Sequence, residues 1–173
     1  MGVGRVALLG VAGSMIAFSA IANDAPAQSA QGWTAAEPQF EWGRPYFGVS
    51  GGGWYDLGVG WEFIRANFIV GRNFQLGPFV AGIEATAGVY WPTPTFEAYL
   101  MARAGLLAGH RLLIYAVAGV GWDFGCCAIV AGGGVEAALG NQVSLRVEAL
   151  AYAYGLPFDY FGLTAGLNFF IGD

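Results

Sequence analysis

The clearest pattern in this sequence lies in Phe161-Gly162-Leu163-Thr164-Ala165-Gly166-Leu167-Asn168-Phe169-Phe170, a segment that ends three residues before the C-terminus. Its odd positions carry Phe, Leu, Ala, Leu and Phe, whereas its even positions carry Gly, Thr, Gly and Asn before ending on Phe. A period of two places these sets on opposite faces of a β-strand. One face suits lipid and the other a tight polar interior, which is typical of a strand in a transmembrane barrel.

The same alternation recurs in segments of about ten residues that are separated by turn residues. We identify eight candidate strands, at 46–54, 60–72, 78–90, 95–107, 111–122, 127–138, 142–153 and 160–171. An even number of strands places both ends of the chain on the periplasmic side of the membrane. The sequence therefore predicts an all-β domain over residues 45–173, an eight-stranded antiparallel up-and-down transmembrane β-barrel.

The N-terminus has the features of a secretory signal peptide over residues 1–22. Arg5 is its only charge, and Ala20-Ile21-Ala22 fits a small-x-small cleavage site. The alternative is a membrane anchor, but glycines make this segment weak for a permanent span. Residues 23–44, which are rich in Ala, Gln and Pro, predict a periplasmic lead-in with no packed structure. Export and a barrel together predict the outer membrane.

Composition supports a membrane barrel over a soluble domain. Hydrophobic residues make up 56% of the chain and charged residues 11%, whereas soluble domains carry about 25% charged residues. The chain has 29 glycines, which suit strands that curve around a narrow lumen. Without Arg5, six arginines face 12 acidic residues, a net charge of 6 − 12 = −6. No basic patch is present, which argues against nucleic acid as a partner.

Strand parity assigns most of the charged side chains to the interior. If Phe79, Ile83 and Val89 face lipid, Glu84 faces inward on the same strand. The same reasoning turns four more charged residues inward: Arg103, Glu136, Arg146 and Glu148. An unpaired charge costs about 2–4 kcal/mol on the lipid face at the membrane midplane, and a buried unpaired charge is also costly. We predict a luminal ion-pair network of these five residues that orders the barrel; a gated ion path is the alternative.

Aromatic residues gather at the strand ends that the topology assigns to the outside. Amphipathic rings collect at bilayer interfaces. The sequence therefore predicts an outer aromatic girdle. The alternative fold, a soluble β-sandwich, would not sort its tryptophans by strand end. Its members are Trp54, Trp61, Trp91, Trp122, Tyr152 and Tyr160.

Several short motifs carry a family resemblance that covers nearly all of residues 40–171. Trp42 precedes the aromatic-x-Gly strand Tyr46-Phe47-Gly48, and the second hairpin ends in Gly82-Ile83-Glu84. Three strand motifs complete the likeness: Ala102-Arg103-Ala104-Gly105, Gly132-Gly133-Gly134-Val135-Glu136 and Ser144-Leu145-Arg146-Val147-Glu148. In these motifs the chain resembles the small outer-membrane β-barrel family of the OmpA/OmpX type, and most closely the porin-family surface proteins of α-proteobacteria.

The resemblance implies outer-membrane lipid, lipopolysaccharide and the barrel-assembly machinery as partners. Members of the family usually end on an aromatic residue that the assembly machinery reads. Phe169 and Phe170 are the candidates here, but Ile171-Gly172-Asp173 follow them. The signal is therefore either weakened or read internally. The four outer loops are also short, which speaks against an adhesin role.

No constellation for catalysis, cofactor binding or metal binding is recognisable. His110 is the only histidine, and it lies at a turn predicted to be periplasmic. A lipid-modifying barrel enzyme would need His and Ser together at the outer rim. One histidine and one pair of adjacent cysteines match no metal site of known spacing. We therefore expect a non-enzymatic protein without cofactor or metal.

Cys126 and Cys127 are adjacent and are predicted to lie at the tip of the third outer loop. Three interpretations remain open. The first is a vicinal disulfide that stiffens the loop, although adjacent cysteines pair only with strain. The second is an inert reduced pair, although the periplasm is oxidising. The third is a set of intermolecular disulfides that link a covalent oligomer.

The leading functional hypothesis is a structural role in envelope integrity or a role at the cell surface, since an eight-stranded barrel has room only for side chains or one small ligand. One alternative is binding or passage of a small apolar molecule or ion. Its motive is a set of inward-facing residues: Tyr99, Met101, Leu113, Tyr115, Val117, Val130 and Leu150. Another alternative is a subunit that packs against itself or other membrane proteins through a smooth exterior of small residues.

Overall fold

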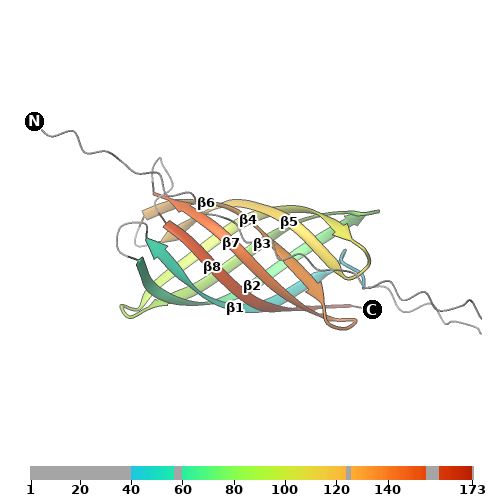
Figure 1. The fold of residues 1–173 in the computed structure, drawn as a ribbon, viewed down its shortest axis with the longest axis horizontal. Coiled ribbons are helices and arrows are strands. Elements are labelled where there is room, and N and C mark those ends of the chain that lie inside the picture. Colours follow the sequence, from blue (N-terminus) through green and yellow to red (C-terminus); the bar gives the residue numbers. More distant parts are fainter. Residues whose placement is uncertain (1–39, 57–59, 124–125, 155–159, 173) are drawn as a thin grey trace, which may run out of the picture. The chain divides into compact units, whose positions relative to one another are not determined.

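The computed structural model describes residues 40–56, 60–123, 126–154 and 160–172, with only the backbone described for Asp56, residues 61–63, Asp123 and Cys126. These residues form eight strands in chain order (Figure 1). The strands are β1 (Pro45–Asp56), β2 (Gly60–Leu76), β3 (Phe79–Trp91), β4 (Thr95–Ala108), β5 (Leu112–Asp123), β6 (Cys126–Ala138), β7 (Val143–Ala153) and β8 (Tyr160–Phe170).

The strands close into an antiparallel barrel. Each strand pairs with its sequence neighbours, and β1 also pairs with β8, from Tyr46 opposite Phe170 to Asp56 opposite Tyr160. The predicted fold class and all eight predicted strands are confirmed. Among the described residues, no helix is long and apolar enough to cross a bilayer.

The largest difference from the predicted strand boundaries is at the end of β2. A turn was predicted at residues 73–77, but β2 continues to Leu76, which pairs with Phe79. Alternation persists through Asn73-Phe74-Gln75-Leu76, and Gly77 has a φ of +60°. This left-handed conformation, which glycine adopts without a steric penalty, lets two residues reverse the chain.

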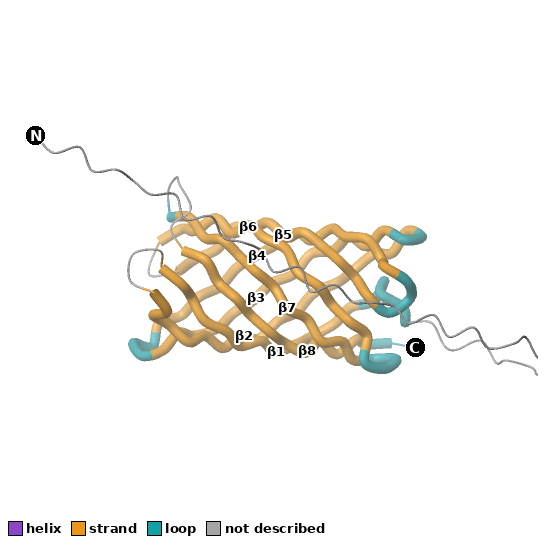
Figure 2. Tube along the Cα trace, viewed as in Figure 1, coloured by secondary structure: helices purple, strands orange, loops and turns teal. Residues whose placement is uncertain are grey.

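The two ends of the barrel differ in their connections. We call the end where β1 begins and β8 ends the terminal end; it also holds the turns at 77–78, 109–111 and 139–142. The opposite end, here the loop end, is where β2, β4, β6 and β8 begin, and it holds the described turn at 92–94. Figure 2 shows the described turns at both ends of the barrel and the C-terminus at the terminal end.

The two faces of the barrel wall follow the predicted parity. On β8, Phe161 and Leu163 are exposed, whereas Thr164 and Asn168 are buried. Large apolar side chains on the outer face are far more exposed than a soluble protein tolerates, as with Leu76 at 78% and Ile64 at 72%. The exterior is therefore an apolar surface suited to lipid.

The interior is filled by two groups of apolar side chains. The terminal cluster consists of Phe40, Trp42, Tyr46, Ile69, Val80, Leu113, Tyr115, Ala138 and Phe170. The loop-end cluster consists of Trp54, Tyr90, Tyr99, Met101, Val117, Ala128, Val130, Leu150 and Tyr152. Polar side chains occupy the same inner face.

The prediction of an unpacked lead-in was wrong for its last residues. Trp42 has no exposed surface and Phe40 is 5% exposed. Their ring centroids lie 4.6 Å apart, and Phe40 packs edge-on against Phe170 at 4.9 Å. The physical reason is the barrel's open mouth, where inward-facing aromatic rings such as Phe170 would otherwise meet water.

Candidate functional site

The candidate site is the polar centre of the lumen, where the structure brings all five predicted charged residues together. Arg146 on β7 donates to both carboxylate oxygens of Glu84 on β3, at 2.6 and 3.0 Å. It also pairs with Glu148, its neighbour on the same strand face. Arg146 therefore joins two carboxylates that come from different strands.

Arg103 on β4 forms the second centre of this network. Its guanidinium lies 2.5 Å from Glu136 Oε2 on β6 and 3.7 Å from Glu84 Oε2. It also lies over the ring of Tyr115 at 4.0 Å from the centroid, which adds a cation–π contact. We call these five residues the luminal network.

Neutral polar groups complete the hydrogen bonding of the three carboxylates. Tyr46 donates to Glu84 at 2.7 Å, and Tyr115 donates to Glu148 at 2.8 Å. Ser144 and Asn168 both donate to Glu136, Asn168 at 2.8 Å. Buried carboxylates need such donors because they have lost water. The sequence analysis placed neither Tyr46 nor Asn168 at this site, although both share the inward parity.

All five charged side chains of the network are buried. None of the five residues exposes more than 4% of its surface. Residues that line a continuous water path would be in contact with water. The network therefore fills the centre of the barrel, where two guanidinium groups pair with three carboxylates.

One ion pair outside the luminal network, which the sequence analysis missed, lies nearer the loop end. Arg65 Nε on β2 lies 3.3 Å from Glu97 Oε1 on β4, and both side chains are buried. Arg65 also donates to the hydroxyl of Tyr152, while Tyr90 donates to Glu97 at 2.6 Å. Strand parity could have placed Glu97 in the lumen, because it has the same parity as Tyr99, Met101 and Arg103.

The predicted outer girdle was wrong for half of its members. Trp54 and Tyr152 have no exposed surface and stack in the lumen with centroids 4.5 Å apart. Tyr160 packs against Trp54 at 5.5 Å. A strand-end position fixes depth but not face, and Trp54 points inward opposite Gly162. The indole ring thus occupies space that glycine leaves open.

The remaining girdle residues lie differently. Trp91 and Trp122 are on the outer face, 51% and 53% exposed, at the loop ends of β3 and β5. The side chain of Trp61 lies outside the described residues. Outward-facing tryptophans at this depth are suited to a bilayer interface.

Comparisons with known proteins agree with this geometry. No family model matches the chain. A 25 kDa outer-membrane immunogenic protein of Brucella ovis is 26% identical over 204 aligned residues, which cover 92% of this chain and 94% of that protein. This chain is a small outer-membrane β-barrel protein.

Solved structures show the same fold as this outer-membrane barrel. A de novo designed transmembrane β-barrel matches with a TM-score of 0.56 and 13% identity, covering 77% of this chain and 99% of the design. Neisserial surface protein A matches with a TM-score of 0.50 and 11% identity, covering 73% of this chain and 96% of that protein.

The terminal end of the outer-membrane barrel is closed by residues 40–44, which we call the end cap. Arg44 donates to the carbonyl oxygens of Gly172 at 2.6 Å and Asn141 at 2.5 Å. The Trp42 backbone N–H donates to Gln75 Oε1 at 3.2 Å, and its indole N–H to the carbonyl oxygen of His110 at 3.4 Å. The end cap therefore contacts β2, two turns and Gly172, which lies two residues beyond β8.

The other predicted residues have no joint site. Phe170 is buried in the terminal cluster, while Phe169 is half-buried and stacks on Phe47 at 5.3 Å; their role as an assembly signal stays a prediction. His110 is exposed in a turn. In the described part of the chain, no group of three or more metal-ligating side chains occurs.

The cysteines lie on a strand and not at a loop tip. β6 begins at Cys126, opposite Asp123, and Cys127 pairs with Trp122. Cys127 is exposed and is a free thiol in the structure. The side chain of Cys126 lies outside the described residues, so the three interpretations of this pair stay predictions.

Proposed function

We propose that this barrel is a non-enzymatic, non-conducting component of the outer membrane with a structural or surface role. The observation that carries the proposal is the buried luminal network. Ions cross a membrane through a hydrated path, and charged side chains that line such a path remain in contact with water. Here the guanidinium and carboxylate groups bind one another and the neighbouring hydroxyls.

The packing of the apolar residues also supports this proposal. It argues against the alternative function, passage of a small apolar molecule through the lumen. The side chains that motivated the alternative are all buried in the terminal and loop-end clusters. Leu113 and Val130 have no exposed surface at all. Rings and aliphatic chains thus fill the space that a ligand would need.

Export through the secretory pathway and exposure at the cell surface are part of the proposal. The apolar N-terminal segment with its small-x-small site supports export. The Brucella relative is named an outer-membrane immunogenic protein, which supports exposure of the loop end outside the cell. The likeness to porin-family and OmpA-like proteins supports the same orientation.

Electrical recording tests the filled lumen. Residues 23–173, refolded in detergent and inserted into planar bilayers, should give no stepwise conductance, whereas a refolded general porin should conduct under the same conditions. Persistent channel steps from the refolded chain would refute the proposed closed lumen.

A deletion strain tests the role in the envelope. We expect increased sensitivity to detergent, restored by the full chain but not by a chain that lacks residues 1–22. Fractionation should place the full chain, and not the truncated one, in the outer membrane. Equal complementation by both chains would contradict the proposed export.

A further inference from the structure

One arginine lies on the outer face of the barrel, away from the carboxylates of the lumen. Among the strand side chains that the structure describes, Arg72 on β2 is the only charged one that faces outward. Arg65, Arg103 and Arg146 all lie in the lumen with carboxylate partners. Within the described part of the chain, no carboxylate pairs with Arg72; its guanidinium lies 5.2 Å from the ring centroid of Phe74.

The depth of Arg72 places its charge near one membrane interface. Arg72 pairs with Pro45, the first residue of β1. Phe74 lies on the same face, two residues nearer the terminal end, so the guanidinium reaches towards that end. The cost of a lipid-facing arginine falls steeply from midplane to interface, and long basic side chains extend towards headgroups. An anionic headgroup at this level would neutralise the charge.

An apolar groove begins beside Arg72 and runs towards the loop end. The first hollow, of about 280 Å³, is lined by Arg72, Ile83 and Val70 among others. The second, of about 430 Å³, shares Val70, Ala85 and Leu100 with the first, so the two are continuous.

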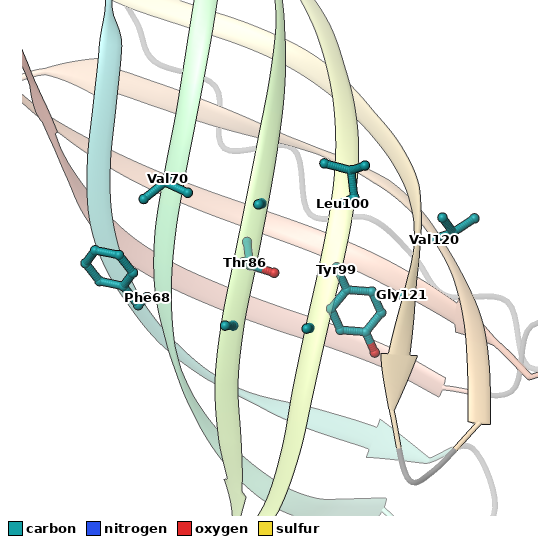
Figure 3. A pocket seen from close by; sticks show the side chains of 10 residues that line it. Phe68, Val70, Thr86, Tyr99, Leu100, Val120 and Gly121 are labelled. Atoms are coloured by element: carbon teal, nitrogen blue, oxygen red, sulfur yellow. The ribbon is translucent and has the colours of Figure 1, made fainter.

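Small side chains on neighbouring strands create this groove. Its floor is formed by Ala85, Ala87 and Ala98, while Phe68 and Val70 stand on one side. Figure 3 shows this side of the groove and, across Thr86, Leu100 and Val120 on the other. A methyl floor between larger side chains gives an apolar trough.

We propose that this groove binds one phospholipid of the leaflet at the terminal end, with its phosphate on Arg72 and an acyl chain along the alanine floor. The inference rests on the proposed function, because it requires a bilayer around the barrel. A cation at one end and a continuous apolar trough leading away from it match the two parts of an anionic lipid.

Charge argues against a partner barrel as the occupant, and membrane depth argues against lipopolysaccharide. A second copy of the barrel would need an acidic group to meet Arg72, and the strand side chains that the structure describes include no outward-facing carboxylate. In the proposed orientation, lipopolysaccharide lies in the leaflet at the loop end, whereas Arg72 lies towards the terminal end. The observations therefore favour a phospholipid over a partner barrel or lipopolysaccharide.

Native mass spectrometry of the detergent-refolded chain, titrated with dimyristoyl phosphatidylglycerol, tests this proposal. Wild type should retain one lipid tightly. Arg72→Gln should weaken retention about fivefold, the contribution of one arginine near an anionic headgroup. Ala85→Leu, which fills the floor, should also weaken it. Arg111→Gln, in an exposed turn of the same end, and Ala149→Leu, on the outer face of β7, are the matched controls and should bind as wild type does.

Each outcome bears on the proposal. Equal lipid retention by wild type, Arg72→Gln and Ala85→Leu would overturn the proposal. Weaker retention by Ala85→Leu alone would also overturn it, because Arg72 would then make no contact with the headgroup. Dimers in place of lipid adducts would assign the groove to a second copy, and tighter retention of lipid A would assign it to the other leaflet. Heat-modifiable migration on gels is measured for every variant. If wild type shows no folded band, the proposed function fails; if it folds but binds no lipid, only this inference fails.

Discussion

At the scale of single residues, Arg146 has the most demanding position in the barrel. Its guanidinium contacts Glu84 and Glu148, and all three side chains are buried. Replacing a whole buried ion pair by apolar groups is often nearly neutral, whereas removing one partner leaves an uncompensated charge. The network therefore stabilises the fold only as a complete set.

Arg146→Met should destabilise the refolded barrel by about 3–5 kcal/mol, the cost of breaking a buried pair from one side. Urea unfolding in lipid vesicles, followed by tryptophan fluorescence, measures this loss. Arg111→Met removes an exposed arginine from a turn and should change stability little. Adding Glu84→Gln to Arg146→Met should recover part of the lost stability, because it removes one of the carboxylates that Arg146 no longer pairs with. Equal effects at Arg146 and Arg111 would show that the pairing contributes nothing.

At the scale of strands, inward-facing glycines lie opposite large inward-facing side chains. Gly71 on β2 pairs with Tyr46 on β1, and Gly105 on β4 pairs with Tyr115 on β5. A Cβ at Gly71 would lie 2.9 Å from Tyr46 Cε1, and one at Gly105 would lie 2.8 Å from Tyr115 Cα. Glycine thus makes room in a narrow lumen for the rings and charged chains that fill it.

Gly52→Ala should disrupt the seam that closes the barrel. On β1, a Cβ at Gly52 would overlap with the carbonyl oxygen of Leu163 and lie 2.8 Å from Thr164 Cα on β8. These are backbone atoms, so no rotamer change relieves the overlap, and overpacking costs about 1–3 kcal/mol or more. Gly51→Ala is the matched control, because the atom nearest to a Cβ at Gly51 is the Arg65 carbonyl oxygen, at an ordinary contact distance of 3.5 Å. The folded gel band should melt at lower temperature for Gly52→Ala alone, and unchanged melting would contradict the packing argument.

Alternation along strands explains how much of this structure could be predicted from sequence. A period of two gave the correct face for Glu84, Arg103 and Arg146, because a charge on the lipid face is excluded by its cost. The same rule applied to Arg65, but the register shift between Trp54 and Tyr55 lies close by, where counting parity along β1 and β2 is interrupted. Long-range packing at the mouths has no local signal, so the burial of Trp42 was missed.

At the scale of the whole molecule, aromatic layers close the barrel at both ends around a polar centre. Trp42 and Phe170 lie at the terminal end, and Trp54 stacks with Tyr152 at the loop end. The luminal network lies between them, so low-dielectric layers separate its charges from water. Excluding water strengthens the ion pairs and also makes any unpaired group expensive. Closure and charge pairing therefore depend on each other.

Trp42→Ala should open the terminal end while leaving the loop end closed. The indole ring has no exposed surface, and removing a buried aromatic ring costs about 3–5 kcal/mol. Water would then reach Tyr46 and Phe170, so backbone amides near the terminal end should exchange hydrogen for deuterium faster than in wild type. Trp91→Ala removes an exposed indole at the loop end and should leave both stability and exchange nearly unchanged. Faster exchange at both ends in Trp42→Ala would mean that the end cap stabilises the barrel globally. Exchange confined to the terminal end would show that the cap acts as a local closure over the polar centre.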